Sequence, residues 1–174
     1  MELFRTYAKY NQWMNNSLYE KCIDLGQQNI EKDQGAFFES ILKTLNHLLI
    51  ADIFWLSRCT GDKSVAKLED SDGNRILLTS LDQIVYRDIS QLFKARQKID
   101  ADIVQYVSSL SSTDAGREIT YSTSQGVTQS NAVESVLLHW FNHQTHHRGQ
   151  VTVMLSQQGV DYGLTDLIYV KDLD

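Results

Sequence analysis

Apolar residues recur at intervals of three and four positions along most of this chain, the spacing that gives an α-helix one apolar face. The spacing predicts four long helices, over residues 2–24, 35–59, 80–110 and 131–158. It is most regular in the second stretch, where it is carried by Phe38, Ile41, Leu42, Leu45, Leu48, Leu49 and Leu56. The sequence contains no proline, the strongest helix breaker, which agrees with helices of this length.

Residues with known capping preferences lie at several of the predicted helix ends. Ser80 and Gln83 have the spacing of a capping box, in which each side chain satisfies a free backbone N–H of the first turn. Asn131 and Glu134 form a variant of the same motif. Glycine, which readily adopts the left-handed conformation that ends a helix, follows three of the stretches, at Gly26, Gly61 and Gly159.

Two connections between the predicted helices are long enough to hold structure of their own. Residues 118–128 alternate β-branched or aromatic with small polar side chains around Gln125-Gly126, a pattern that predicts a β-hairpin. Residues 61–79 mix charged residues, glycine and serine, and we expect a loop there. The predicted fold class is therefore all-α: a four-helix bundle with a small β-hairpin inserted between helices 3 and 4.

Length and composition limit the kind of protein this can be. At 174 residues, the chain can build one substantial core, so we expect residues 1–174 to form a single domain. A net charge of −6, with Lys and Arg scattered, argues against nucleic-acid binding, which uses a basic face. The longest apolar run is interrupted by Asp52 and is too short to span a membrane, and no secretory signal is visible. These features predict a cytoplasmic protein that binds neither nucleic acid nor membranes.

The cysteines and tryptophans have the positions of packing residues. Cys22 and Cys59 are too few for a disulfide framework and lack metal-site spacing, so we expect two small buried side chains in a reducing compartment. Trp13, Trp55 and Trp140 lie at core spacing in the predicted helices, and we expect them only to pack.

Four of the five histidines fall within nine residues of the last predicted helix, at His139, His143, His146 and His147, whereas His47 lies in the second. Residues four apart in an α-helix are offset by about 40° and rise about 6 Å, so they share one side. Two imidazoles at that spacing can bind one ion at the roughly 2.0–2.1 Å of a zinc–nitrogen bond. Together with His47, the cluster predicts a metal site between two helices.

Spacing alone leaves the ligand set open. His143 shares a helix face with His147 and also with His139, and His146 lies one turn from His143. The apolar stripe of this helix continues the line of His143 and His147, whereas His146 is rotated by about 60° from His143 and is expected to face outward or to support a ligand from outside. His139 could be a fourth ligand or a wall of the pocket. His47, taken alone, could be a partly exposed helix histidine.

Other catalytic patterns are missing from the sequence. The helix of a zinc protease carries a glutamate between its two histidines. No glutamate lies between His143 and His147. The sequence also lacks a legible Ser–His–Asp or Cys–His grouping and a glycine-rich phosphate loop. The metal site is therefore the chemistry that the sequence indicates.

Four segments together resemble one known family. Residues 10–22 are similar to its opening helix, residues 46–58 to its second helix, and residues 161–168 to its C-terminal tail, apart from a proline that the tail commonly carries. Residues 143–150, with the sequence HQTHHRGQ, are similar to its histidine signature. On these segments the chain resembles, over nearly its whole length, the DinB/YfiT-like superfamily of metal-dependent four-helix-bundle proteins.

The resemblance implies which histidines bind the metal and what the protein does with it. It selects His47, His143 and His147 as the three ligands. Some similar proteins transfer or isomerise groups with low-molecular-weight thiols such as bacillithiol or mycothiol, and similar proteins are often homodimers. We therefore expect a small-molecule substrate, a small thiol as a possible second substrate, and a homodimer.

Three neutral imidazoles would leave zinc, nickel or iron with open coordination positions, as catalytic sites do. A thiol bound there would be deprotonated, and a water would be activated towards hydroxide. The favoured function is a divalent-metal-dependent transferase that uses a thiol, with zinc or nickel as the expected metal. The alternatives are a metal-dependent hydrolase and a non-catalytic metal-binding stress protein in which the ion only joins two helices.

Overall fold

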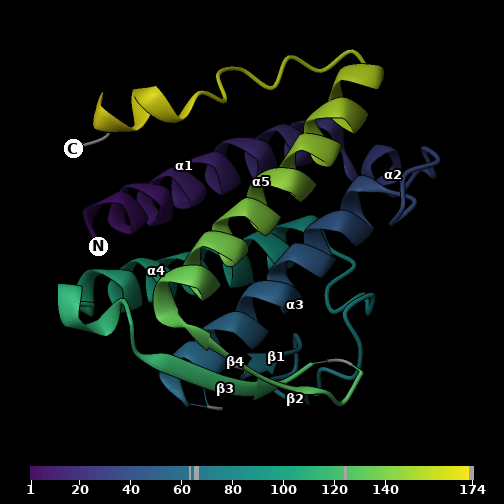
Figure 1. Ribbon diagram of the computed structural model, residues 1–174. Helices are drawn as coiled ribbons and strands as arrows, with labels where there is room; N and C mark the ends of the chain where they lie inside the picture. Colours follow the sequence, from purple (N-terminus) through teal and green to yellow (C-terminus); the bar gives the residue numbers. More distant parts are fainter. Residues whose placement is uncertain (63, 65–66, 124, 173–174) are drawn as a thin grey trace.

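Four long helices form the body of the part of the chain that the structure describes, residues 1–62, 64, 67–123 and 125–172. In this computed structural model they are α1 (Glu2–Leu25), α3 (Ile41–Thr60), α4 (Ile89–Ser109) and α5 (Val133–Gln157) (Figure 1). A short helix and two 3-10 turns accompany them: α2 (Gln27–Ile30), η2 (Ser112–Asp114) and η3 (Leu167–Asp172). The all-α prediction is confirmed.

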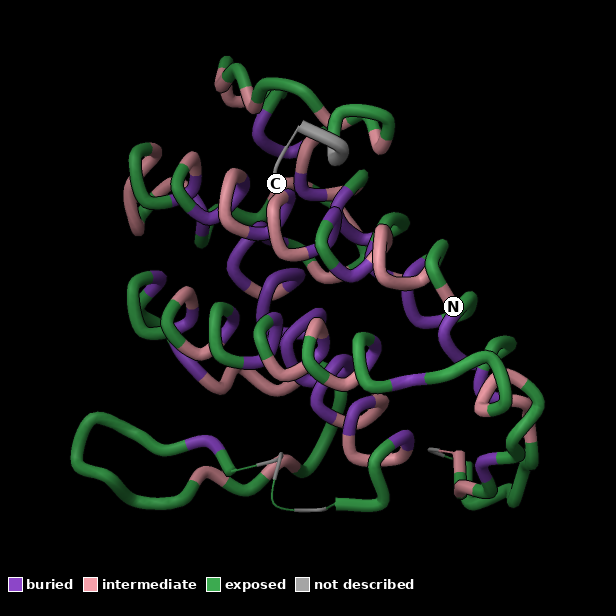
Figure 2. The backbone as a smooth tube through the Cα atoms, turned by 90° about the vertical axis from the view of Figure 1, so that its left-hand side faces the viewer, coloured by how far each residue is buried: buried purple, intermediate pink, exposed green. Residues whose placement is uncertain are grey.

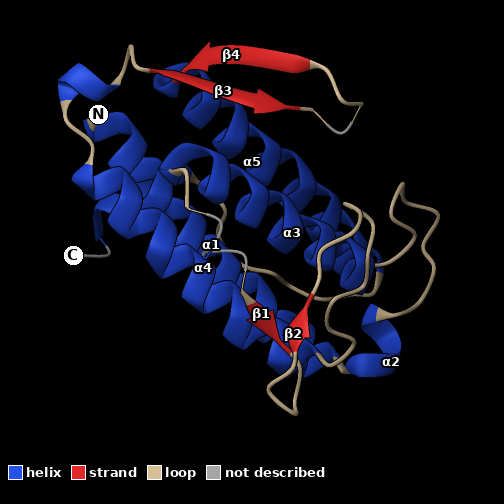
Figure 3. Cartoon of the chain, turned by 90° about the horizontal axis from the view of Figure 1, so that it is seen from below, coloured by secondary structure: helices blue, strands red, loops and turns tan. Residues whose placement is uncertain are grey.

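The predicted β-hairpin is also confirmed, in the connection between α4 and α5. Strand β3 (Glu118–Ser122) pairs antiparallel with β4 (Thr128–Ala132), in a register that joins Glu118 to Ala132 and Ser122 to Thr128. Figure 3 shows this hairpin lying across one end of the bundle, from where the chain passes directly into α5. A second, two-residue pairing of β1 (Leu68–Glu69) with β2 (Arg75–Ile76) lies within the predicted 61–79 loop. Residues 63, 65–66 and 124 of these two regions lie outside the described residues.

The apolar faces of the four long helices meet in one core. Buried positions are most frequent along α3, whereas α1, α4 and α5 each expose one side (Figure 2). The largest fully buried apolar side chains include Trp140, Tyr19, Phe141 and Leu18. Burial of this apolar surface is the main source of stability.

The second predicted helix begins later than its apolar pattern indicates. It was expected from residue 35, but α3 starts at Ile41, where the hydroxyl of Ser40 accepts a hydrogen bond from the backbone N–H of Lys43. In the preceding turn Glu39 has a φ of 64°, a strained left-handed conformation for a residue with a side chain. The turn places the Phe38 ring on the His47 ring, with centroids 4.1 Å apart, so this apolar residue packs on a histidine and does not belong to the helix.

The start of the third predicted helix is wrong by nine residues. Helix α4 begins at Ile89, and its N-cap is Asp88, whose carboxylate accepts the Gln91 N–H at 2.8 Å. The proposed capping residues Ser80 and Gln83 lie in the preceding loop, where the Gln83 side-chain oxygen accepts the backbone N–H of Thr79. Of the two proposed capping residues, Gln83 therefore closes a loop through Thr79 and Leu77.

A buried asparagine explains why that segment is not helical. The side-chain oxygen of Asn46 accepts the backbone N–H groups of Val85 and Tyr86 at 2.8 and 3.0 Å, and its amide donates to the Tyr86 carbonyl. These backbone groups are satisfied by α3 and cannot serve a helix of their own, so tertiary contacts override the local pattern.

The fourth predicted helix also begins slightly later, at Val133. Asn131, expected as its cap, is still paired with Ile119 in the hairpin, and its side chain donates to the Tyr121 hydroxyl.

At the other end of the chain, the segment after α5 runs back along α1, where the Tyr10 hydroxyl donates to the carbonyl of Thr165 at 2.5 Å (Figure 1). Each helix among the described residues is too short or too polar to cross a membrane.

Candidate metal centre

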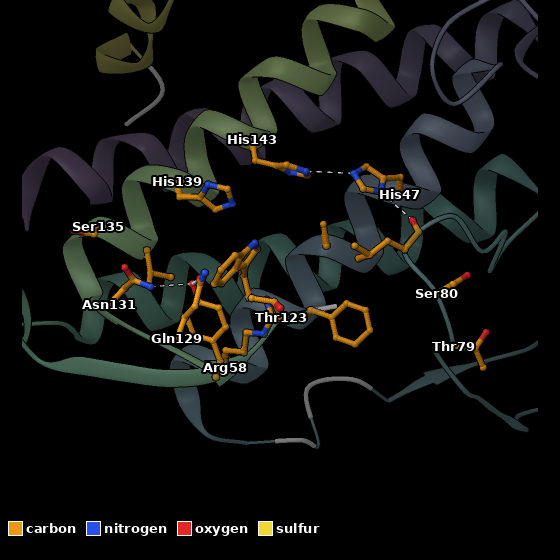
Figure 4. A pocket seen from close by; sticks show the side chains of 16 residues that line it. His47, Arg58, Thr79, Ser80, Thr123, Gln129, Asn131, Ser135, His139 and His143 are labelled. Atoms are coloured by element: carbon orange, nitrogen blue, oxygen red, sulfur yellow. Dashed lines mark hydrogen bonds between the residues drawn. The ribbon is translucent and has the colours of Figure 1, made fainter. Parts of the chain in front are cut away.

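The fold brings together the three histidines that the resemblance selects. His47 comes from the middle of α3, and His143 and His147 lie one turn apart on α5, which packs against α3. One ring nitrogen from each residue lies within 4.8 Å of the other two, and His47 Nε2 and His143 Nε2 are 3.3 Å apart (Figure 4). This group could hold a metal ion.

Hydrogen bonds on the far side of two rings fix which nitrogen faces the centre. Nδ1 of His47 donates to the carbonyl of Leu81 at 2.9 Å, and Nδ1 of His147 donates to the side-chain oxygen of Gln150 at 2.8 Å. Each ring is therefore protonated at Nδ1 and presents the lone pair of Nε2, since a neutral imidazole carries one N–H. Such partners orient metal-binding histidines and raise their basicity.

The three imidazoles are neutral at physiological pH. Burial, together with the nearby His147 and His47 rings, lowers the pKa of His143 to about 3. Burial also lowers the pKa values of His47 and His147. Among the described residues, Nδ1 of His143 has no hydrogen-bond partner although it is buried. Neutral imidazole nitrogens are suitable ligands for divalent ions such as zinc, nickel and iron.

The distances fit such an ion after a small adjustment. Two nitrogens bound to one tetrahedral zinc at roughly 2.0–2.1 Å lie about 3.4 Å apart. The 3.3 Å between His47 and His143 already matches this separation, and the widest spread in the group is 4.8 Å. Small side-chain rotations that move the ring nitrogens by about an ångström would bring all three to binding distance of one ion. The residues therefore fit the ion that the sequence predicts.

The two remaining histidines of the cluster lie outside this group. His146 is exposed; its ring meets the His147 ring edge-on, with centroids 4.8 Å apart, and the Gln150 amide lies 3.4 Å from His146 Nε2. The outward orientation predicted for His146 is therefore confirmed. His139 lies one turn before His143, with ring centroids 6.1 Å apart, and its ring meets Trp55 edge-on. Of the two roles left open for His139, the structure places it on the wall of a pocket.

That pocket is a cavity of about 700 Å³ that begins at His47 and His143 (Figure 4). Its floor is one face of α3, its opposite side belongs to α5, and the hairpin and the loop before α4 supply the other walls. The lining residues beyond these two histidines that are used below are Trp55, Arg58, Leu81, Tyr121, Val136 and His139. Two of the three clustered histidines thus face open space large enough for a small molecule.

A buried polar network ties α3 to α5 beside the histidines. The carboxylate of Asp52, which is 1% exposed, accepts a hydrogen bond from the Trp140 indole at 2.7 Å and another from the amide of Gln144, the residue after His143. Arg96 of α4 neutralises the same carboxylate at 2.7 Å. Because Asp52 and His47 share one helix, the network fixes the relative position of the two helices that carry the histidines.

The network continues along α5 beside the other ligand. The guanidinium of Arg148, the residue after His147, donates to the Gln144 side chain at 3.1 Å and to Asn11 of α1 at 2.6 Å. These two amide oxygens partly offset the cost of burying the charge, and burial lowers the pKa of Arg148 to about 10. Both candidate ligands on α5 are thus followed by a residue anchored in the core.

Sequence reasoning missed several residues of this region. The prediction that the tryptophans only pack is wrong for two of them, because Trp140 donates to Asp52 and Trp55 lines the cavity. Arg58 and Tyr121 were not singled out, although Arg58 follows His47 by eleven residues and so lies on the same helix face. The prediction for the cysteines holds: Cys22 and Cys59 are buried and unpaired, and burial raises both thiol pKa values to about 12.

A helical bundle with three neutral histidines at one end of a cavity fits a metal-binding protein. The DinB family profile matches residues 1–173, and the chain belongs to the DinB family. It is 25% identical to "Protein DinB" of Bacillus subtilis (strain 168) over 166 residues, which cover 92% of this chain and 91% of that one. A crystal structure of a DinB-like protein from Bacillus cereus ATCC 10987 has the same fold, with a TM-score of 0.59, 18% identity, and 87% and 89% of the two chains covered.

Proposed function

We propose that this protein is a divalent-metal-dependent transferase that joins a low-molecular-weight thiol to a small electrophile. The observation that supports this proposal is that His47 and His143 both line the 700 Å³ cavity. A purely structural metal site is closed, whereas a catalytic site keeps an open position next to space for a substrate. Here the clustered nitrogens lie at the end of such a space.

The proposed ligands are His47, His143 and His147, and zinc or nickel is the expected metal, with iron as a further candidate. A bound divalent cation supplies Lewis acidity, which lowers the pKa of a thiol in the adjoining cavity. In the overall reaction the thiol gives up its proton, its sulfur forms a bond to the electrophilic carbon, and the leaving group departs with the electron pair of the broken bond.

The chain's own residues would bind and orient the two reactants. The apolar side chains of Trp55, Leu81 and Val136 remove water from the cavity walls, which favours a small apolar electrophile. The imidazole of His139, one turn from His143, lies where it can accept the thiol proton. These residues come from three different elements, so the site is assembled only by the complete fold.

The cavity favours a transferase over the two alternatives. Among the described residues, no carboxylate lines the cavity, so a hydrolase would have to activate water with the metal ion alone or with His139 as the base. A non-catalytic protein that uses the ion only to join α3 and α5 would need no cavity beside it, and Asp52 already joins these helices. The homodimer and the cytoplasmic location stay predictions, the former open to a sedimentation measurement.

The experiment that tests the proposal begins with protein purified without an affinity tag, because a histidine tag would carry metal of its own. Elemental analysis should find about one zinc or nickel per chain. Metal-loaded protein should then accelerate the reaction of a small thiol with an electrophile such as 1-chloro-2,4-dinitrobenzene, and His143→Ala should abolish both properties. Bound metal without thiol-dependent turnover in a broad electrophile screen would favour the non-catalytic alternative.

A further inference from the structure

One face of α3 runs from the histidine cluster to a cation at the far side of the cavity. His47, Ala51, Trp55 and Arg58 succeed one another at intervals of three or four residues, so all of them line the cavity floor. Eleven residues separate His47 from Arg58, which corresponds to about three turns and a rise of about 16 Å. Figure 4 shows Arg58 on the opposite side of the pocket from the His47–His143 pair.

The guanidinium of Arg58 is held in place by its neighbours. Its central carbon lies 4.7 Å from the ring centroid of Trp55 and 4.9 Å from that of Tyr121. One terminal nitrogen donates to the Ser122 carbonyl at 3.0 Å. The group is therefore oriented before a ligand arrives, which reduces the entropy lost on binding.

The same guanidinium has unused capacity for hydrogen bonds. An arginine carries five N–H donors, and Arg58 makes a single hydrogen bond to the residues that the structure describes. Within the described part of the chain, no carboxylate forms an ion pair with it. Arg58 is half-buried between aromatic rings, where a charge without a partner is unfavourable and an incoming anion is bound more strongly than in open water.

The charge of the cavity differs from that of the whole protein. The chain carries a net charge of −6, yet Arg58 is the one residue with a permanent charge among the described residues that line the cavity. The lining between Arg58 and the histidines includes Trp55, Leu81 and Val136. The cavity thus combines an apolar middle section with a cationic end.

We propose that Arg58, between Trp55 and Tyr121, is the binding subsite for the carboxylate of a small organic acid whose apolar body lies along α3 towards the histidines. A planar carboxylate matches the planar guanidinium and can accept two parallel hydrogen bonds from it. The long arginine side chain leans towards the N-terminus of its helix, so the ligand needs to span on the order of 10 Å. The proposal rests on the proposed function in one respect: it names the class of substrate or co-substrate that enters that cavity.

The test compares 4-phenylbutanoate with its amide, which has the same shape and carries no charge. Calorimetric titration of the metal-free protein measures the anion subsite without the ion. The carboxylate should bind at least about tenfold more tightly than the amide, as expected for a charge-assisted bidentate contact. Arg58→Gln should reduce this preference to less than about twofold, while Arg75→Gln, which removes an exposed arginine on β2, should leave it unchanged.

Two further measurements keep the test decisive if Arg58→Gln folds poorly. Arg58→Lys retains the charge without the planar fork, and it should lower the preference for the carboxylate several-fold. In the wild type, the Nε–H resonance of Arg58 should shift on addition of 4-phenylbutanoate and not of the amide. Equal affinities for the two compounds, undetectable binding of the carboxylate at millimolar concentration, or a preference that survives Arg58→Gln would each overturn the proposal.

The same preparation separates this proposal from the proposed function. A carboxylate preference that depends on Arg58, in protein that binds no zinc or nickel, supports the subsite and contradicts the metal-dependent function. Metal binding with thiol-dependent turnover, but without any carboxylate preference, supports the function and overturns the subsite.

Discussion

The Nε2 atoms of His47 and His143 face each other across the contact between α3 and α5 at 3.3 Å. His47 uses its Nδ1 proton on the Leu81 carbonyl, so its Nε2 has only a lone pair to offer. Two nitrogen lone pairs that face each other repel, and a proton or a cation between the two Nε2 atoms removes this repulsion. Because the fold holds both nitrogens in place from separate helices that also share an apolar core, we expect the site to be prepared for an ion that folding does not require.

Removing one proposed ligand should therefore affect metal binding more than folding. In His143→Ala the affinity for zinc or nickel should fall at least about a hundredfold, because one of three nitrogen donors is lost. The melting temperature of the metal-free variant should stay within a few degrees of the wild type, since the apolar core is unchanged. Metal titration and thermal melts followed by circular dichroism measure the two effects.

A structural metal site would behave differently in the same experiments. Chelators would then unfold the wild type, and His143→Ala would not reach the folded state. Either result would contradict the catalytic assignment of the site.

The outlying histidines should separate binding of the ion from binding of the substrate. His146→Ala should retain the metal stoichiometry of the wild type, because His146 is exposed and lies outside the clustered group. His139→Ala should also retain the metal but should change the affinity for thiol or substrate, since His139 lines the cavity. If His146→Ala abolished metal binding while His147→Ala left it intact, the ligand set would be His47, His143 and His146.

The Asp52 carboxylate should be important for stability. Arg96 is paired with both Asp52 and Asp100, so Asp52→Asn removes one of its two buried carboxylate partners, which should lower the free energy of unfolding by about 1.5–3 kcal/mol. The variant should also bind metal more weakly, because α3 and α5 lose a contact beside the histidines. Urea titration and metal titration measure the two changes.

A matched control is offered by the exposed Asp24 near the end of α1. Asp24→Asn makes the same chemical change on the surface and should alter the free energy of unfolding by less than about 0.5 kcal/mol. Similar effects of the two substitutions would show that the buried network contributes nothing specific.

The metal-free protein should lose stability as the pH falls below about 6.5. The pKa of His143 is lowered to about 3 in the folded protein, whereas the unfolded chain has the usual histidine value of 6.5. Between these two values the unfolded chain binds a proton that the folded chain does not, so the free energy of unfolding decreases as the pH falls through this window. Urea titrations of the metal-free protein from pH 7 to pH 4 measure the decrease.

Carboxylates titrate in the lower part of the same range, so a variant is needed to isolate the histidine. His143→Gln removes the group and should give a shallower dependence of stability on pH than the wild type. Superimposable pH profiles for the two proteins would mean that burial does not hold His143 neutral.

Local sequence information predicted the four long helices and the shared orientation of two candidate metal ligands. His143 and His147 are one turn apart, so their common direction follows from helical geometry alone. The starts of α3 and α4 could not be predicted in this way, because Phe38 packs on His47 and Asn46 binds the backbone of Val85 and Tyr86. Both contacts join segments that only the tertiary fold brings together.

The cavity was beyond sequence reasoning for the same physical reason. The position of Arg58 on the face of His47 follows from its spacing, but its partners Trp55, Tyr121 and Ser122 are divided between α3 and the hairpin. Whether an arginine in a helix faces solvent or a ligand site depends on the element that packs opposite it. The sequence of α3 does not indicate where the hairpin packs. The placement of His139 on the wall was undecided for this reason too.

The hairpin of β3 and β4 forms one wall of the cavity while adding little to the core, since Ile119 is the buried position along its strands. The histidines, by contrast, stand on helices locked together by Asp52. Mutations can therefore accumulate on the hairpin and alter which molecules enter, while the bundle continues to fold and to present the same three nitrogens. The bundle and the hairpin can therefore change separately, and one helical scaffold can acquire new ligands during evolution through changes in the hairpin alone.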